Sequence, residues 1–433
     1  MTETSTIKVG DYVVIQRQKY TKLHKYGSLD SIVILGKQKI SLRSIAGQKY
    51  FTTFKMVPNE KNPKSGFSLE VCSEAEAKNL RDALNVQECG TDNRNILDDG
   101  ESQGLKADDI DKLRGECSGS TELIEKIVEN SKTFTSKTQY SQEKYLKKKS
   151  KKYCEFICIR KPTIRLLSEI YYRQKPEEIM GIRMDTLSQI VSYSGISAFG
   201  NYLLYDSGSN GLLAATMLNS IGAGTEAKLV NLHPGNEPQK QAFLALGFPQ
   251  EQASRCVSVN IYSVLRQYYQ GETTLNGTEP VAAGSKRKPD DDENAPVEEK
   301  RQRLEEPNPE MVTIEPKTEP TDKKLKWQLE NERAVELMKG KFDCLVIAAK
   351  EHPQNIIKAL LPFLKPSRPL VIFNSCREVL MDIYVDLKAS GEVNGLRLAS
   401  NWLRSYQILP NRTHPEVNMN GNSGFIMFGY SVS

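Results

Sequence analysis

A turn with two glycines, between a predicted strand and a predicted helix, is the first place in this sequence where chemistry could occur. Residues 200–224 read GNYLLYDSGSNGLLAATMLNSIGAG. Enzymes with nucleotide cofactors use such a strand–turn–helix unit because free backbone N–H groups at the helix N-terminus bind the ligand. They usually carry Gly-x-Gly-x-Gly, which lets the backbone approach the cofactor closely. Here the turn keeps only Gly208 and Gly211, so the fold signal persists while the cofactor site is degraded.

Two other positions of such a cofactor enzyme have lost their carboxylates. The next predicted strand, 227–233, should end in an acidic residue that binds the ribose hydroxyls, but it ends in Asn-Leu-His at 231–233. After the strand predicted at 342–348, an active base methyltransferase carries an acidic residue before a proline turn, where the carboxylate positions the target amine. This sequence reads Ala-Ala-Lys-Glu-His-Pro at 348–353. We therefore predict no catalytic and no cofactor-binding residue, unless Glu351 replaces the lost acid from a shifted register.

The strongest concentration of charge lies in residues 132–152, KTFTSKTQYSQEKYLKKKSKK, which hold eight lysines and one glutamate. If Ser141 caps a helix, one face of it carries a ladder of ammonium groups, because residues three and four apart share a face. The residues of that ladder are Lys144, Lys147, Lys148 and Lys151. Such a ladder binds phosphates by releasing counterions, and the tyrosines within it could stack on bases. A solvated charged face or a nuclear-import signal is the alternative interpretation.

Length and composition limit the number of domains and argue against a membrane protein and a metal site. A chain of 433 residues is long enough for about two to three domains. No apolar run approaches the ~20 residues of a membrane-spanning helix, so we expect no membrane association. Of the eight cysteines, only Cys154 and Cys158 lie close together. A lone Cys-x-x-x-Cys without nearby histidines is weak evidence for zinc, and we predict no metal site.

The pattern of predicted elements divides the chain into four parts. Short runs that alternate apolar and polar residues predict a small β-barrel near the N-terminus. Alternating strands and helices near the C-terminus predict one doubly wound sheet, interrupted by a polar segment that cannot bury enough apolar surface to become ordered. The predicted parts are an N-terminal β-barrel at 1–90, a helical connector with the basic stretch at 91–195, a Rossmann-like domain with a degenerate cofactor site at 196–270 and 326–433, and a long disordered insert at 271–325. The predicted fold class is therefore α/β.

The predicted insert contains two basic clusters. They are Lys-Arg-Lys at 286–288 and Lys-Arg-Gln-Arg at 300–303, and an acidic spacer separates them. Two such clusters in flexible sequence are typical of a bipartite nuclear-import signal, and an ordinary charged linker is the alternative. We therefore expect the protein in the nucleus.

Four stretches of this sequence resemble one family of proteins. They are QYSQEKYLKKK at 139–149, KPTIRLL at 161–167, DNRNI at 92–96 and WLRSYQILPNRTHP at 402–415. Together they make the chain similar to the non-catalytic subunit of the eukaryotic tRNA (adenine-N1)-methyltransferase. The resemblance runs over nearly the whole chain outside the predicted insert.

This resemblance implies an assembly as well as a fold. It implies an N-terminal β-barrel and a C-terminal Rossmann-like methyltransferase domain. It also implies a two-plus-two heterotetramer with a homologous catalytic subunit that methylates N1 of an adenosine in the tRNA T-loop. The catalytic subunit would hold S-adenosylmethionine, and this chain would contribute tRNA-binding surface and no cofactor.

The resemblance also implies which residues contact tRNA. The candidates are polar or basic and lie in four separate stretches of the sequence. They are Asn93, Arg94, Asn95, Lys144, Lys147, Lys148, Lys149, Lys151, Lys152, Lys350, His352 and Arg377. Two other interpretations stay open, an active nucleic-acid methyltransferase with an atypical pocket and an RNA-binding scaffold of another complex.

Overall fold

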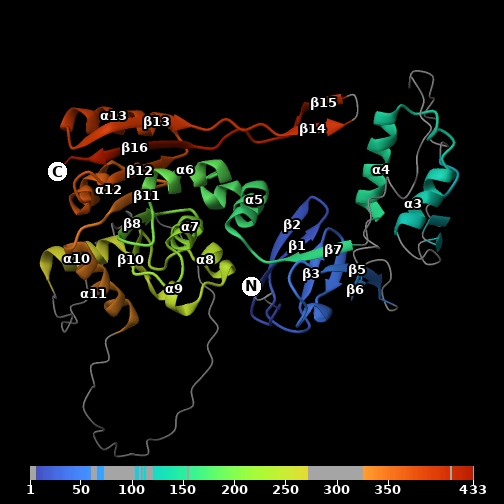
Figure 1. The fold of residues 1–433 in the computed structure, drawn as a ribbon, viewed down its shortest axis with the longest axis horizontal. Helices are drawn as coiled ribbons and strands as arrows, with labels where there is room; N and C mark the ends of the chain where they lie inside the picture. Colours follow the sequence, from blue (N-terminus) through green and yellow to red (C-terminus); the bar gives the residue numbers. More distant parts are fainter. Residues whose placement is uncertain are drawn as a thin grey trace, which may run out of the picture.

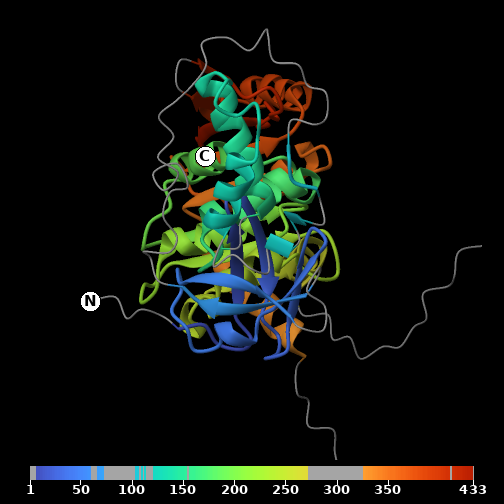
Figure 2. The same cartoon turned by 90° about the vertical axis from the view of Figure 1, so that its right-hand side faces the viewer.

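Two seven-stranded sheets organise the part of this chain that is described. The computed structural model describes residues 6–59, 66–72, 103–106, 109–110, 112–113, 120–153, 156–271, 325–409 and 412–432. The predicted insert at 271–325 lies outside these residues except at its two ends. Figure 1 shows the N-terminal sheet between the C-terminal sheet and a pair of helices, α3 (Ser120–Glu129) and α4 (Gln139–Tyr153). The same pair faces the viewer in Figure 2.

Strands with alternating burial form the N-terminal sheet. Val33 and Leu35 are buried while Ile32 and Ile34 are exposed, as expected of a strand with one face on a core. The strand order is β2-β1-β7-β5-β6-β4-β3, antiparallel except for the β4–β6 pair. The strands are β1 (Tyr12–Arg17), β2 (Tyr20–Lys25), β3 (Ile32–Leu35), β4 (Gln38–Ser41), β5 (Thr53–Pro58), β6 (Gly66–Val71) and β7 (Phe156–Arg160). Lys22 Nζ donates a 2.9 Å hydrogen bond to the Ile34 carbonyl and joins the edge strands β2 and β3, so the sheet is a nearly closed barrel.

Strand β7 enters this barrel from a distant part of the sequence. It pairs with β1 on one side and with β5 on the other. Residues 91–195 were predicted to form a helical connector. The structure shows that this range also contains β7. Its alternation is short, with only Ile157 and Ile159 buried, and helices flank it in sequence. The chain therefore leaves the barrel after β6, forms α3 and α4, and returns to complete the sheet.

The C-terminal sheet has the strand order β10-β9-β8-β11-β12-β16-β13. Neighbouring strands pair in parallel, except that β16 is antiparallel to both β12 and β13. The strands are β8 (Asn201–Asp206), β9 (Lys228–His233), β10 (Cys256–Asn260), β11 (Cys344–Ala348), β12 (Pro369–Asn374), β13 (Val393–Ser400) and β16 (Phe425–Ser431). A doubly wound sheet in which only β16, between β12 and β13, runs against the other strands is a Rossmann-like arrangement. The predicted α/β class is confirmed.

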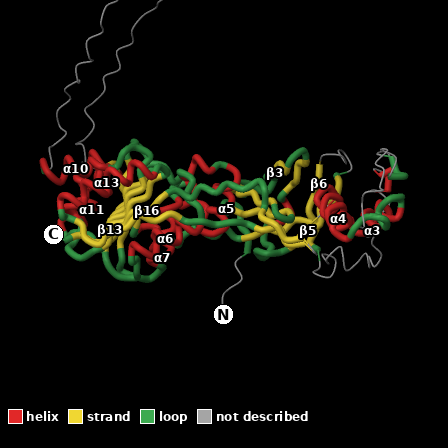
Figure 3. Tube along the Cα trace, turned by 90° about the horizontal axis from the view of Figure 1, so that it is seen from above, coloured by secondary structure: helices red, strands yellow, loops and turns green. Residues whose placement is uncertain are grey.

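Helices cover both faces of the C-terminal sheet, as Figure 3 shows from above. One buried apolar cluster packs a face against α10 (Ile261–Gln270), α11 (Lys326–Lys339), α12 (Gln354–Leu360) and α13 (Arg377–Ser390). A second cluster packs the other face against α5 (Ile164–Gln174), α6 (Met184–Ser194), α7 (Leu212–Ile221) and α8 (Gln241–Leu246). Short elements complete the fold, namely α9 (Gln250–Ser254) and 3-10 turns at Arg43–Ile45, Pro176–Ile179 and Leu361–Phe363. Within the described ranges, no helix is long and apolar enough to cross a membrane.

An arm, residues 401–424, connects β13 to β16 and extends away from the C-terminal sheet (Figure 1). It carries a hairpin of β14 (Tyr406–Leu409) and β15 (Arg412–Pro415). The Tyr172 hydroxyl donates a 3.2 Å hydrogen bond to the Asn420 carbonyl, and Arg183 donates one of 3.1 Å to the Gly421 carbonyl. Helix α5 and the residue before α6 therefore hold the returning half of the arm.

A substitution at Gly424 tests how closely the arm is packed where it enters β16. Its φ of +70° lies in the left-handed region, and a Cβ there would lie 2.4 Å from the ring of Phe373. We expect Gly424→Ala to lower the free energy of unfolding by about 2–4 kcal/mol, because backbone strain and overpacking act together. Gly421→Ala is the matched control, since its Cβ would meet nothing within 4 Å. Urea melts measure both variants, and equal melts would contradict this packing.

Candidate functional site

Parallel sheets of this type bind ligands at the carboxyl ends of their strands, where the strand order reverses. In this chain that point lies between β8 and β11, whose last paired residues are Asp206 and Ala348. Strand β8 runs into the glycine turn (residues 206–211), and α7 follows at once. The loop after β11 (residues 349–353) lies beside this turn. These two segments are therefore the candidate site.

The buried carboxylate of Asp206 fixes the glycine turn from inside. One carboxylate oxygen accepts hydrogen bonds from the N–H groups of Gly208 (3.0 Å) and Ser209 (2.8 Å), and the other accepts one from the Ser209 hydroxyl. Burial raises the pKa of Asp206, while the bonds from Ser209 and Gly208 and the charge of Lys350 oppose that rise. These two backbone N–H groups are therefore bonded within the turn and are not presented to a ligand.

The side chain of Lys350 covers the outer surface of the glycine turn. A Cβ built on Gly208 would lie 2.1 Å from Cε and 2.9 Å from Nζ of Lys350. The Lys350 N–H donates a 2.8 Å hydrogen bond to Ser207 Oγ, and the Ser207 N–H donates one of 3.1 Å to the Ala348 carbonyl. The loop after β11 is thus fastened onto the turn, and the exposed side chain of Lys350 lies against the backbone of Gly208.

Glu351, the carboxylate left in this loop, is held by β8. It accepts a hydrogen bond from the hydroxyl of Tyr205. Burial and the neighbouring Glu351 raise the pKa of Tyr205, so this hydroxyl stays protonated and donates at neutral pH. The geometry does not favour Glu351 as a substitute for the lost acid, because its oxygen already binds the tyrosine.

The loop between β9 and α8 closes the second side of the turn. A Cβ on Gly211 would lie 2.6 Å from the carbonyl oxygen of Gln239, and the Gln239 side chain accepts a 2.9 Å hydrogen bond from the Asn210 N–H. His233 is buried at the end of β9, where its Nδ1 lies 2.8 Å from the Gly235 carbonyl. Burial lowers the pKa of His233, which keeps it neutral. β9 itself ends without a carboxylate for ribose hydroxyls, and the residues at its end do not fit S-adenosylmethionine.

Helix α4 forms the predicted basic surface. It begins at Gln139, slightly before the predicted cap at Ser141. Its inner face packs on α3 through a small apolar cluster that includes Leu146 and Tyr153. The hydroxyl of Tyr145 donates a 2.9 Å hydrogen bond to Gln103, and burial raises the pKa of this half-buried tyrosine. Tyr145 and Tyr153 therefore stabilise the helix pair and are not free to stack on bases.

The structure places the predicted tRNA-contact residues in two separate regions, and their contact with RNA stays a prediction. Lys144 and Lys148 are exposed on α4, whereas Lys149 Nζ lies 5.1 Å from the centre of the Tyr145 ring. The exposed residues at the other region, the carboxyl edge of the C-terminal sheet, are Lys350, His352 and Arg377. The residues whose side chains lie outside the description are Asn93, Arg94, Asn95, Lys147, Lys151 and Lys152. Figure 1 shows α4 and the C-terminal sheet at opposite ends of the molecule.

The groups that close the cofactor site were not predicted from the sequence. Lys350 was predicted only to contact RNA, and Gln239 and Tyr205 had no predicted role. The long cation at 350, in the stretch where a carboxylate is missing, was a signal that this side chain could fill the site. The Gln239 carbonyl left no signal, because it acts through its backbone.

Fold and site together define this chain as a Rossmann-like methyltransferase-fold protein whose cofactor site is closed by its own residues. The profile of the Gcd10p family matches residues 6–308, and the chain belongs to this family.

Two relatives cover almost all of the chain. It is 32% identical over 461 residues to the tRNA (adenine(58)-N(1))-methyltransferase non-catalytic subunit of Mus musculus, across 98% of this chain and 88% of that protein. It is 31% identical to the subunit of the same name from Dictyostelium discoideum, across 100% of this chain and 80% of that protein. Among solved structures, the tRNA (m1A58) methyltransferase of Aquifex aeolicus gives a TM-score of 0.43 at 9% identity, covering 99% of this chain and 100% of that one. A likeness this low carries no argument, and the fold follows from the strand order.

Asp206→Asn tests whether the turn is held by a carboxylate whose charged form is disfavoured by burial. Because burial raises the folded-state pKa of Asp206 above 3.8, its contribution to stability is complete below 3.8 and is lost as the pH rises through the folded pKa. Asparagine cannot ionise, so the variant should be more stable than the parent near neutral pH, and the difference should shrink toward acid. Urea unfolding between pH about 4 and about 8 measures this. Asp382→Asn, at an exposed position, is the control. A difference in unfolding free energy between Asp206→Asn and the parent that does not change with pH would contradict this explanation.

Proposed function

We infer that this chain serves as the non-catalytic subunit of a tRNA (adenine(58)-N(1))-methyltransferase. The observation that carries the inference is the side chain of Lys350, which lies against Gly208 where a cofactor-binding turn needs open space. A methyltransferase fold closed in this way needs another chain to hold the methyl donor and the catalytic acid. Membership of the Gcd10p family, and the names of both near-full-length relatives, support the same role.

The partner that this role requires is a catalytic subunit, and we extend the proposal to two copies of each chain. Exposed apolar side chains on the arm support a protein partner, since large exposed apolar groups mark interaction surfaces. Trp402 is 79% exposed and Ile408 is 76% exposed. A catalytic subunit of the same fold would bury these side chains and supply S-adenosylmethionine.

The contribution of this chain to substrate binding is electrostatic. Lys144 and Lys148 extend from α4 into solvent, and Lys350, His352 and Arg377 are exposed at the far end of the molecule. Phosphate contacts at both ends of the molecule would offset the few kcal/mol needed to unstack a base. Once it is unstacked, the T-loop adenosine can reach the active site of the partner.

We also propose that the assembly works in the nucleus. The support is the pair of basic clusters at 286–288 and 300–303, which lie outside the described residues.

The function is tested with the complex of this chain and its catalytic subunit, carrying Lys144→Gln and Lys148→Gln. We expect tRNA affinity to fall about tenfold and the slope of log affinity against log salt to flatten by about 1.5, because two phosphate contacts are lost. The KM for tRNA in methyl transfer should rise while kcat stays nearly constant. Filter binding at several salt concentrations and transfer of labelled methyl groups measure these quantities.

Two controls make this test decisive. Lys339→Gln with Lys388→Gln removes the same charge from α11 and α13, and should leave slope and KM unchanged. Omitting this chain should abolish methylation by the catalytic subunit. Full methylation without this chain, or failure of this chain to associate with a catalytic subunit while it still binds tRNA, would replace the proposal with the RNA-binding scaffold.

A further inference from the structure

The turn that leads into β5 of the barrel holds a phenylalanine in a backbone conformation suited to glycine. The N–H and the hydroxyl of Thr52 both donate hydrogen bonds to the Lys49 carbonyl, of 3.4 and 2.7 Å. Between these residues lies Phe51, whose φ of 71° is in the left-handed region. Turns with a positive φ at this position usually carry glycine or asparagine there, and a bulky side chain costs about 1–3 kcal/mol.

Burial of the ring does not offset this strain. The side chain of Phe51 is 60% exposed. Six non-glycine residues have a positive φ in the described part of the chain, and Phe51 is the one aromatic residue among them. Met180, the other large apolar residue of this set, is buried. Strained residues cluster at functional sites, so an exposed and strained aromatic ring indicates a binding role.

Strand β7 holds the turn and places a cation beside the ring. The Phe51 N–H donates a 2.7 Å hydrogen bond to the Ile159 carbonyl. The guanidinium carbon of Arg160 lies 5.7 Å from the centre of the Phe51 ring, within the range of a cation–π contact. Arg160 also donates a 2.9 Å hydrogen bond to Gln16 Oε1, which orients the guanidinium. The turn therefore presents an aromatic face and an oriented cation together.

The barrel around this turn is strongly basic. Its described residues, 6–59, 66–72 and 156–160, include eleven lysines and arginines and three carboxylates. Lys49, in the turn itself, is exposed. An excess of positive charge attracts phosphates, and exposed aromatic rings within basic surfaces stack on unpaired bases. RNA therefore matches this surface better than an apolar protein surface does.

Strand β7 also connects the turn to the basic helix α4. The helix ends at Tyr153, and β7 runs from Phe156 to Arg160 beside the Phe51 ring. At about 3.3 Å per residue, this strand is about 13 Å long from its first to its last residue. Figure 1 shows α4 next to the barrel. An RNA that contacts the lysines of α4 can therefore reach Phe51 as well.

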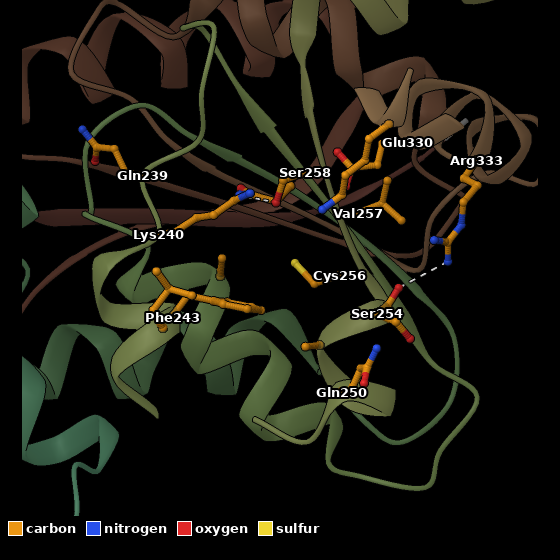
Figure 4. A pocket seen from close by; sticks show the side chains of 15 residues that line it. Gln239, Lys240, Phe243, Gln250, Ser254, Cys256, Val257, Ser258, Glu330 and Arg333 are labelled. Atoms are coloured by element: carbon orange, nitrogen blue, oxygen red, sulfur yellow. Dashed lines mark hydrogen bonds and ion pairs between the residues drawn. The ribbon is translucent and has the colours of Figure 1, made fainter. Parts of the chain in front are cut away.

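The cavity of about 360 Å³ beside β9 and β10 is a less suitable place for an unpaired base. Asn231 and Gln239 line it, so it belongs to the closed cofactor site. Figure 4 shows Lys240 extending across it toward Ser258. The exposed ring of Phe51 has no such cover.

We propose that the turn at 49–52 and Arg160 form a stacking site for an unpaired base of a bound RNA. The base stacks on the exposed ring of Phe51, and Lys49 and Arg160 bind the neighbouring phosphates. This inference rests on the proposed role in tRNA binding and adds a contact surface on the barrel, where no RNA contact was predicted from the sequence.

The test uses the complex of this chain and its catalytic subunit. Phe51→Gly removes the ring and relieves the backbone strain, so we expect tRNA affinity to fall at least fivefold while the melting temperature stays equal or rises. The slope of log affinity against log salt should stay constant, because no charge is lost. Phe51→Trp keeps an aromatic ring and should retain the affinity of the parent. Filter binding at several salt concentrations and thermal melts measure these quantities.

Further variants separate stacking from charge. Arg160→Gln should flatten the salt slope by about 0.7–0.9, because one phosphate contact is lost. Phe199→Ala removes a ring that is 74% exposed just before β8, and should change neither affinity nor slope. The parent should bind a short single-stranded RNA more tightly than a duplex of the same length, and Phe51→Gly should lose this preference.

The outcomes separate this inference from the proposed function. Unchanged tRNA affinity in folded Phe51→Gly, with assembly and methylation intact, would overturn the stacking site and leave the subunit role in place. Weaker association with the catalytic subunit at unchanged tRNA affinity would make Phe51 a protein contact and would also overturn it. A parent complex that binds no tRNA would contradict the proposed function itself.

Discussion

The contact between Lys350 and the backbone of Gly208 determines what this chain can do. Strands β8 and β11 pair in register up to Asp206 and Ala348, so a residue that follows β11 must lie over the turn that follows β8. An enzyme of this fold uses that adjacency to bring an acid next to a bound cofactor. In this chain the loop after β11 instead places Lys350 there, its side chain lies against Gly208, and its charge acts on the buried Asp206.

The fold tolerates this loss because stability and chemistry reside in different residues. The two apolar clusters that pack helices onto the C-terminal sheet consist mainly of strand and helix side chains such as Leu203 and Val346, and they include none of the residues of the glycine turn. Loops can therefore change without loss of the core. A scaffold of this kind keeps its fold after its own site has closed.

Much of this organisation could be predicted from local sequence. The strand–turn–helix at 200–224 and the basic helix near 139–153 carry patterns within one short window, and the structure contains both. Strand β7 was missed because a five-residue alternation between helices is a weak signal. The contact of Lys350 with Gly208 could not be predicted because it depends on pairing between strands some 140 residues apart in sequence. Likewise, only the packing of α4 on α3 shows that Tyr145 and Tyr153 face inward.

The central claim is that this chain cannot hold a methyl donor, and calorimetric titration of the purified, folded chain with S-adenosylmethionine tests it most directly. A cooperative thermal melt first establishes that the chain is folded. The account predicts no saturable heat at millimolar cofactor, because Lys350 and the Gln239 carbonyl cover the turn and no carboxylate ends β9. Saturable binding at micromolar cofactor would contradict it, and the chain would then have to be assayed as a methyltransferase.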